Sequence, residues 1–350
     1  MLEQIARAEC LLKERELEAA LAEFDRAERM GADVDGCSAA RWMAWMLRGD
    51  FAAAWRESDA IRARGGEDPH RFWMGEDLRG QRVIVRCLHG FGDAVQFLRY
   101  LPQIQAMARH VIVEVPPRML EWAPMLDGVD DVVTWGADAP QIAPAWDVQV
   151  EVMELPYVFR TTTEDLPIAV KYVRPPARDL ERMAKEMGAP NRTRVGLVWS
   201  GGEWNPQRSL PTEAIQSLVE SGSAEFWSLQ GEALDSRALE WVHAGALRDA
   251  AQLGDGLRAL AMVIGNLDLV ITVDTLAAHL AGAMGKPAWV LLQRSADWRW
   301  MTNRCDSPWY PKTRLFRQQH DGSWNGVVEE VAEALKHLVG CVGARAEMRE

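Results

Sequence analysis

The spacing of hydrophobic positions along the chain changes once, close to residue 75. Before that point, residues 2–64 carry apolar and small side chains at helical spacing. After it, short apolar, β-branched runs of strand length alternate with helical stretches, beginning at residues 82–88. Strands that alternate with helices predict parallel sheets covered by helices. We therefore expect an all-α region followed by α/β domains.

The alternating part divides into two blocks. A Pro-Pro pair within residues 173–177 separates them, and such a pair stiffens and extends a linker. The predicted fold class is α/β, with two Rossmann-like, doubly wound domains that face a cleft. The predicted boundaries are 1–74 for the helical region, 75–174 and 175–340 for the two domains, and 341–350 for a tail. The strand candidates are 82–88, 111–115, 131–134, 146–150, 166–170, 194–199, 225–229, 268–273 and 288–292.

The helical region contains a weak internal repeat. Residues 17–20, Leu-Glu-Ala-Ala, align with residues 51–54, Phe-Ala-Ala-Ala, at an offset of 34, which is the tetratricopeptide period. About two units fit, fewer than the three or so that a free-standing array needs. We therefore expect these helices to pack on the following domain. A plain helical extension without a partner is the alternative.

Composition and charge exclude several classes of protein. The chain has 350 residues and an ordinary content of hydrophobic and charged residues, and its net charge of −12 argues against a nucleic-acid or anionic-membrane surface. Its five cysteines form no CxxC pair, so neither a zinc site nor a disulfide framework is indicated. No apolar run approaches the ~18 residues of a membrane span. We expect a soluble, cytoplasmic protein.

A glycine-containing loop follows the first predicted strand. It reads His-Gly-Phe-Gly-Asp, and Val95 holds the place where a dinucleotide fingerprint would need its third glycine. We therefore reject a dinucleotide site. What remains is a loop that permits close backbone approach, with the carboxylate of Asp93 at the mouth of a helix. The alternative is that Asp93 only stabilises the helix N-terminus.

Residues 264–292 read as strand, turn, helix, turn and strand, one unit of a parallel sheet. Asp274 and Thr275 stand where the strand ends and the helix begins, and His279 follows one turn later on the same face. A helix N-terminus at the carboxyl end of a parallel strand can hold a phosphate. The alternative is that Asp274 and Thr275 are only caps and His279 is a satisfied polar residue.

A segment rich in tryptophan and arginine follows this unit, at residues 293–318. Flat aromatic faces that stack on sugar rings, beside charged groups that bind hydroxyls, would make a sugar-binding wall. The alternative is a loop held by buried tryptophans and Arg–Asp pairs. The candidates are Asp297, Trp298, Arg299, Arg304, Asp306, Trp309 and Tyr310.

Three motifs together resemble glycosyltransferase family 9: GFGDAVQFLRYLP, DLVITVDTLAAHLAGAMGKP and ADWRWM…DSPWYP…RLFRQ. More narrowly, the chain is similar to bacterial proteins that join tetratricopeptide repeats to a heptosyltransferase-like GT-B module. The resemblance covers about residues 75–338. It implies an inverting, metal-independent transfer of a sugar from a nucleotide-sugar donor to a glycan or protein acceptor, without a cofactor.

The resemblance also implies roles for individual residues. Asp93 matches the acidic residue proposed as general base for the acceptor hydroxyl. Donor-binding positions are Ser200, Gly201, Gly202, Arg208, Gln230, Glu232, Asp274, Thr275, Leu276 and His279. Acceptor- or sugar-binding positions are His89, Gly90, Gly92, Gln96, Asp297, Trp298, Arg299 and Trp309.

Two positions depart from the family pattern. Leu276 stands where the family usually has Gly directly after Asp-Thr, which narrows backbone access to a phosphate. His89 precedes the glycine loop where related sequences often carry Gln or Glu. These departures leave a second hypothesis open, a non-catalytic nucleotide-sugar-binding protein whose repeat helices recruit a protein partner.

Overall fold

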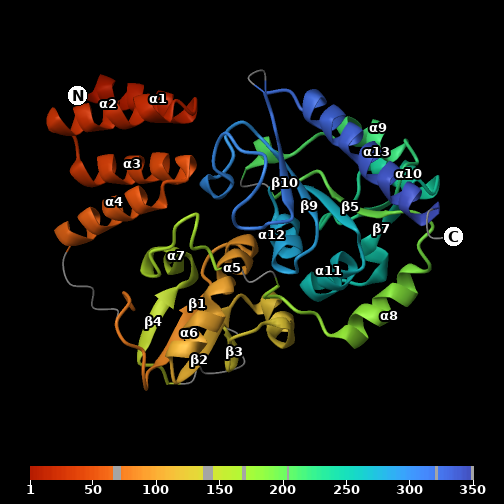
Figure 1. Cartoon of the computed structure of the whole chain (residues 1–350), viewed down its shortest axis with the longest axis horizontal. Helices are drawn as coiled ribbons and strands as arrows, with labels where there is room; N and C mark the ends of the chain where they lie inside the picture. The colour runs from red at the N-terminus through yellow and green to blue at the C-terminus, as the bar shows by residue number, and fades with distance from the viewer. Residues whose placement is uncertain (66–71, 137–144, 168–170, 203–204, 320–321, 348–350) are drawn as a thin grey trace.

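The computed structural model describes residues 1–65, 72–136, 145–167, 171–202, 205–319 and 322–347. Four N-terminal helices precede two parallel sheets, in the order that the hydrophobic pattern predicts (Figure 1). Most of the strand candidate at 166–170 lies outside the described residues. Among the helices described, none has the length and apolar character to cross a membrane.

The N-terminal helices form two consecutive pairs, α1 (Leu2–Lys13) with α2 (Leu17–Arg29) and α3 (Val34–Arg48) with α4 (Phe51–Arg64). Gly49 ends α3 in the left-handed conformation, at φ +86°. These pairs agree with the helix-turn-helix units expected from the 34-residue offset, and their assignment as tetratricopeptide units stays a prediction. Buried alanines let the helices approach closely: Ala8, Ala20, Ala27, Ala44, Ala53 and Ala54.

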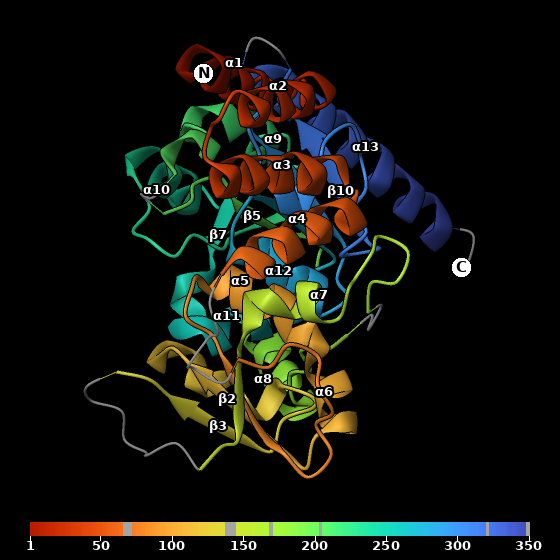
Figure 2. The same ribbon diagram turned by 90° about the vertical axis from the view of Figure 1, so that its left-hand side faces the viewer.

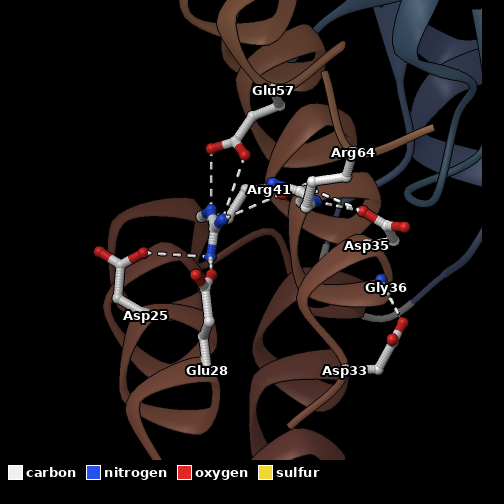
Figure 3. Close-up of polar contacts among 9 residues, drawn as sticks. Asp25, Glu28, Asp33, Asp35, Gly36, Arg41, Glu57 and Arg64 are labelled. Atoms are coloured by element: carbon white, nitrogen blue, oxygen red, sulfur yellow. Dashed lines mark hydrogen bonds and ion pairs between the residues drawn. The ribbon is translucent and has the colours of Figure 1, made fainter. Parts of the chain in front are cut away.

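A partly buried arginine, Arg41, joins three of these helices (Figure 3). On α3, Arg41 donates from Nε and Nη2 to Glu57 of α4 (2.8 and 3.1 Å), and from Nη1 to Glu28 of α2 (2.6 Å). Burial opposes its charge, but the hydrogen bonds that Arg41 donates to Glu57 and Glu28 outweigh burial and raise the pKa of Arg41. A second pair, Arg64 with Asp35 (2.6 Å), joins α4 to α3 nearby.

The first sheet has four parallel strands in the order β3-β2-β1-β4. They are β1 (Arg82–Arg86), β2 (His110–Val115), β3 (Asp131–Thr134) and β4 (Val148–Glu151). The helix predicted after β1 is divided as Pro102 requires, since the proline is the second residue of a new helix. The helical segments are α5 (Phe91–Phe97), η1 (Leu98–Tyr100), α6 (Leu101–Met107), η2 (Pro117–Met125), η3 (Val152–Glu154) and α7 (Leu155–Val158).

The second sheet has six parallel strands in the order β10-β9-β8-β5-β6-β7. They are β5 (Arg194–Val198), β6 (Glu225–Ser228), β7 (Leu247–Asp249), β8 (Leu269–Val273), β9 (Ala288–Leu292) and β10 (Thr313–Arg317). One face is covered by α8 (Ala177–Met187), α11 (Gly256–Gly265) and α12 (Leu276–Ala283), and the other by α9 (Gln216–Val219), α10 (Ser236–His243) and α13 (Asn325–Glu347) (Figure 1). Shorter turns are η4 (Pro206–Arg208), η5 (Thr212–Ile215), η6 (Ala250–Leu253) and η7 (Trp298–Trp300).

Several elements of the second domain were not predicted. The strand β7 has three residues and β10 is an edge strand with two arginines, so neither shows a continuous apolar run. The helices α8 and α10 were also missed. The last helix, α13, continues to Glu347 and so extends into the residues predicted as a tail.

The N-terminal helices pack on both α/β domains, as expected (Figure 2). The indole nitrogen of Trp55 on α4 donates to the Thr161 carbonyl of the first domain (2.7 Å). The backbone nitrogen of Thr302, in the second domain, donates to the Leu47 carbonyl at the end of α3 (2.8 Å). The helices therefore cover the line where the two domains meet.

Candidate functional site

The turn from β8 into α12 is the centre of the candidate site. All five residues of β8 are buried, and Thr275 is the N-cap residue of α12. Its hydroxyl does not cap the helix and instead lies 2.9 Å from the hydroxyl of Thr272. Leu276 is the first residue of the helix and is partly buried. The backbone N–H groups of this helix end are therefore not satisfied by the Thr275 side chain.

His279 lies one turn into α12 and is 5% exposed. Its Nδ1 lies 3.0 Å from the hydroxyl of Tyr310, and its Nε2 lies 3.9 Å from Oδ1 of Asp274. The ring stacks on Trp300, with ring centres 5.3 Å apart. Burial, then the positive charge of neighbouring arginines, lowers the pKa of His279 to about 3. The imidazole is therefore neutral at pH 7.

The pKa of Asp274 is shifted in the opposite direction to that of His279. Its side chain is one-fifth exposed. Burial and the negative charge of Asp297 raise the pKa of Asp274 to about 6, while Arg299 and Arg208 act against this rise. A pH of 7 is about one unit above this pKa, so most Asp274 side chains are ionised at that pH.

Gly92 brings the first domain into contact with this unit. A β-carbon at Gly92 would lie 2.9 Å from Cδ2 of His279, a distance that packed atoms do not tolerate. The glycine therefore permits α5 to lie directly against α12. The expectation of a loop that allows close backbone approach is confirmed, and the group approached is this chain's own imidazole.

Asp93 is the third residue of α5, and its two oxygens have different partners. Oδ2 accepts from the backbone nitrogen of Gly90 (3.0 Å), and Oδ1 accepts from Nη2 of Arg299 (2.6 Å). The bond to Gly90 is the helix-stabilising interaction given above as the alternative. The bond to Arg299 is additional, because it joins the first domain to the second.

Arg299 lies between two carboxylates, with its side chain 9% exposed. Nη1 donates to Asp297 (2.8 Å), and the guanidinium lies over the rings of Phe97 and Trp298, 5.5 and 4.8 Å from their centres. Burial works against its charge, but Asp297 and Asp93 together raise the pKa of Arg299. It is a buried, permanently charged group at the contact between the domains.

The loop after β5 forms the other side of the candidate donor site. The side-chain oxygen of Gln230 accepts from the backbone nitrogens of Trp199 and Ser200 (3.0 and 3.2 Å). Nη1 of Arg208 donates to the backbone carbonyl of Asp274 (2.8 Å), and a β-carbon at Gly201 would lie 2.5 Å from Nε of Arg208. The loop and the β8–α12 turn are thus joined through one guanidinium.

Four further predicted residues are either exposed or fully buried. Gly202 and Glu232 are exposed. His89 is exposed, with Nε2 3.9 Å from Glu151. Gln96 is fully buried, and among the described residues its amide finds no hydrogen-bond partner.

Trp298 and Trp309 do not form a sugar-binding wall. They are 7% and 2% exposed, and their rings pack on each other and on Phe51 and Phe97. With both ring faces buried, stacking on a sugar would need this cluster to open. The geometry therefore favours the alternative, a loop held by buried tryptophans and Arg–Asp pairs.

Sequence reasoning missed a buried arginine of the first domain. Arg99 donates to the carbonyl of Trp309 (2.8 Å) and to the hydroxyl of Tyr172 (3.3 Å), and lies over the ring of Tyr310. Its charge also contributes to the lowered pKa of His279. A helical arginine between apolar neighbours could have signalled a buried charge, but not its partners.

Within the part of the chain that the structure describes, no cluster of three or more His, Cys, Asp or Glu side chains could hold a metal ion. Positive charge near Asp274 comes instead from Arg208 and Arg299. The arrangement can therefore bind an anion and position a carboxylate beside it.

The comparisons with known proteins bear on the fold. No protein-family model matches the chain. Protein FlbA of Caulobacter vibrioides is 25% identical over 366 aligned positions, which cover 92% of this chain. The chain spans only 59% of the length of that relative.

Three solved structures resemble the two α/β domains. The family 9 glycosyl transferase of Veillonella parvula matches with a TM-score of 0.54 at 13% identity, over 76% of this chain and 99% of that one. ADP-heptose LPS heptosyltransferase II of E. coli matches with a TM-score of 0.54 at 16% identity, over 74% and 98%. E. coli heptosyltransferase WaaC with ADP matches with a TM-score of 0.50 at 12% identity, over 74% and 99%. The chain therefore has the GT-B fold of the family 9 heptosyltransferases, preceded by four helices.

Proposed function

We propose that the protein is an inverting glycosyltransferase that moves a sugar from a nucleotide-sugar donor to a glycan or protein acceptor. One observation carries this proposal: Arg299 binds Asp93 of the first domain, and its positive charge also acts on Asp274 and His279 of the second. Both groups follow parallel strands, at the edge where ligands bind in this class of fold. The fold shared with heptosyltransferases supports the proposal.

The donor diphosphate would bind at the start of α12. N–H groups in the first turn of the helix and the hydroxyl of Thr275 would offer hydrogen bonds, and Arg208 and Arg299 would offer positive charge. These groups can stabilise the charge that develops on the leaving diphosphate, which is the role a metal ion has in other transferases. Neutral His279 would orient this end of the helix through Tyr310. On this basis we propose a metal-independent reaction.

Asp93 would act as the general base. Its carboxylate takes the proton of the acceptor hydroxyl while the hydroxyl oxygen bonds to the anomeric carbon. The bond from that carbon to the diphosphate oxygen breaks on the opposite face, and the configuration inverts. In the structure Arg299 donates a hydrogen bond of 2.6 Å to Asp93. We propose that Arg299 releases Asp93 and binds the donor diphosphate before transfer.

A non-catalytic nucleotide-sugar-binding protein is the second candidate. Two observations favour it. Both oxygens of Asp93 already have partners, and a leucine, Leu276, occupies the first position of α12. In this case the N-terminal helices would recruit a protein partner while the pocket senses the nucleotide sugar.

A thermal-shift panel tests the donor site that both candidates need. The panel contains ADP, UDP, GDP and CMP and the glucose conjugates of ADP, UDP and GDP. A ligand at 100 times its dissociation constant should stabilise the protein by about 2.7 kcal/mol. We expect at least one nucleotide to raise the melting temperature, and Arg208→Met to weaken its binding at least tenfold. Arg182→Met, on the exposed face of α8, is the matched control.

The outcomes separate the hypotheses. If no nucleotide shifts the protein, or Arg208→Met binds as tightly as the parent, the donor site is misplaced. Binding without any release of nucleotide from nucleotide sugars, in the presence of candidate glycan and protein acceptors, would favour the non-catalytic candidate.

A further inference from the structure

A cavity of about 380 Å³ lies where the turn between α1 and α2 meets the carboxyl ends of β9 and β10. The helical turn supplies Lys13 and Glu14, and the segment after β9 supplies Gln293, Arg294 and Ser295. Its volume is within the range of small-molecule sites. None of the side chains assigned above to the donor or the acceptor lines this cavity.

Hydrogen bonds hold both walls of the cavity in place. The guanidinium of Arg294 pairs with the Glu14 carboxylate (2.9 Å), so the helical turn is bound to the second domain. Arg15, at φ +67°, donates from Nη2 to the carbonyl of Ala296 (2.7 Å). The amide of Gln318 accepts from the backbone nitrogen of Arg294 (3.2 Å) and donates to a backbone carbonyl (2.8 Å). The cavity therefore has fixed walls on both sides.

Within the described part of the chain, one buried polar atom of the lining has no hydrogen-bond partner. Gln293 is 7% exposed, and its amide nitrogen lies 3.5 Å from the carbonyl of Ser295. Its side-chain oxygen is buried and accepts no hydrogen bond from any described residue. Buried polar atoms are satisfied in nearly all folded proteins, so an acceptor of this kind indicates a donor supplied from outside the chain.

The other lining residues indicate what kind of donor this is. Gln207 and Ser295 are exposed and can both donate and accept hydrogen bonds, as the hydroxyl groups of a sugar do. The half-buried indole of Trp324 offers an apolar surface for the C–H face of a ring. Arg294 and Glu14 neutralise each other, so this pair does not favour a charged ligand over a neutral one.

We propose that this cavity is a saccharide-binding site, formed jointly by the α1–α2 turn and the second domain. A hydroxyl of the sugar donates to Gln293, and the ring lies against Trp324. The site does not depend on the transfer reaction proposed above. It gives the N-terminal helices a direct part in ligand binding.

Saturation-transfer NMR on the full chain tests this site. The probes are methyl β-glucoside, N-acetylglucosamine, maltose and N,N′-diacetylchitobiose, with sodium phosphate and the peptide Gly-Ser-Gly as competitors. We expect saturation of at least one saccharide, with ring protons showing the strongest effect. Gln293→Met should raise the dissociation constant at least tenfold, while Gln103→Met, on the exposed face of α6, should leave it unchanged.

A second variant keeps the test valid if Gln293→Met does not fold. Ser295 is exposed at the cavity, so Ser295→Tyr should fill it and abolish saccharide binding, whereas Ser236→Tyr at an exposed site on α10 should not. The proposal is overturned if no saccharide is saturated or if binding survives Ser295→Tyr. It is equally overturned if phosphate or the peptide displaces the sugar from the parent protein.

Discussion

At the scale of single residues, the contact between Gly92 and His279 sets how closely the two domains approach. We expect Gly92→Ala to lower the free energy of unfolding by about 1–3 kcal/mol, because the new methyl group would overlap the imidazole. Urea unfolding followed by tryptophan fluorescence measures the loss. Gly231→Ala is the control, since a β-carbon there meets nothing within 4 Å. Equal stability of the two variants would show that α5 and α12 are not packed as described.

The opposite pKa shifts of Asp274 and His279 predict that each group makes the free energy of unfolding depend on pH, and one substitution can separate the two effects. The folded protein binds the Asp274 proton more tightly than the unfolded chain, so this group makes stability fall as the pH rises from about 4 to about 6. His279 has the opposite effect between about 3 and 6.5, because its folded pKa is lowered. In the intact protein the two effects largely cancel between pH 4 and 6.

Asp274→Asn removes one of these effects. We expect the stability of the variant, relative to the parent, to increase by about 2 kcal/mol between pH 4 and pH 6 and then to level off. The measurement is the unfolding free energy of both proteins at half-unit pH steps from 3 to 8. A difference that does not change with pH would contradict the raised pKa.

At the scale of elements, Arg41 predicts how the N-terminal helices are held together. Its side chain is 11% exposed and joins α2, α3 and α4 (Figure 3). Arg41→Met would leave the carboxylates of Glu28 and Glu57 without their partner, at a cost of about 3 kcal/mol. Hydrogen exchange of peptides from α2 and α4 should therefore become faster.

Arg48 provides the comparison for this prediction. It is also on α3, but its side chain is 46% exposed and its pair with Glu18 measures 3.4 Å. Arg48→Met should change the free energy of opening, obtained from the exchange rates, by less than about 1 kcal/mol. If both variants exchange alike, the Arg41 network does not hold the helices.

Elements with a strong local signal were predictable from the sequence, and elements defined by their neighbours were not. The β8–α12–β9 unit has continuous apolar runs and a Gly-Lys-Pro break, and Pro102 marks the division between α5 and α6. By contrast, β10 reads Thr-Arg-Leu-Phe-Arg, and among the named strands it pairs with β9. It is a strand because it lies at the edge of the sheet beside β9, and that position cannot be predicted from its own residues.

At the scale of the whole molecule, an aromatic cluster joins the N-terminal helices to both domains. Trp298 lies between Trp42 and Phe51 of the helices and Phe97 of α5. Trp298→Ala should lower the free energy of unfolding by about 3–5 kcal/mol, because it leaves a cavity in this cluster. A tryptophan that served only to stack on a sugar would change affinity and leave stability unaltered.

Trp135→Ala is the control for this prediction, since Trp135 is 38% exposed. Differential scanning calorimetry measures both variants. The outcome that would contradict the aromatic cluster is a Trp298→Ala protein as stable as Trp135→Ala.

The candidate site was predictable in its residue types but not in its connections. The glycine loop and the Asp274–His279 turn could be found from their position after strands. That Arg299 also binds Asp93 could not, because these two residues approach only when the domains are assembled. The same long-range packing decides that Trp298 and Trp309 are buried.

Sugar transfer by the Asp93→Asn variant is the most direct test of the proposed reaction. With the donor that the thermal-shift panel identifies, release of the nucleotide is followed in the presence of acceptor. We expect Asp93→Asn to lower kcat by a factor of at least about 100, the usual range for loss of a general base, with donor affinity changed little. Asp255→Asn, at an exposed position whose side chain caps no helix, should transfer at the parent rate. Unchanged turnover of Asp93→Asn would contradict the proposed role of Asp93 as the catalytic base.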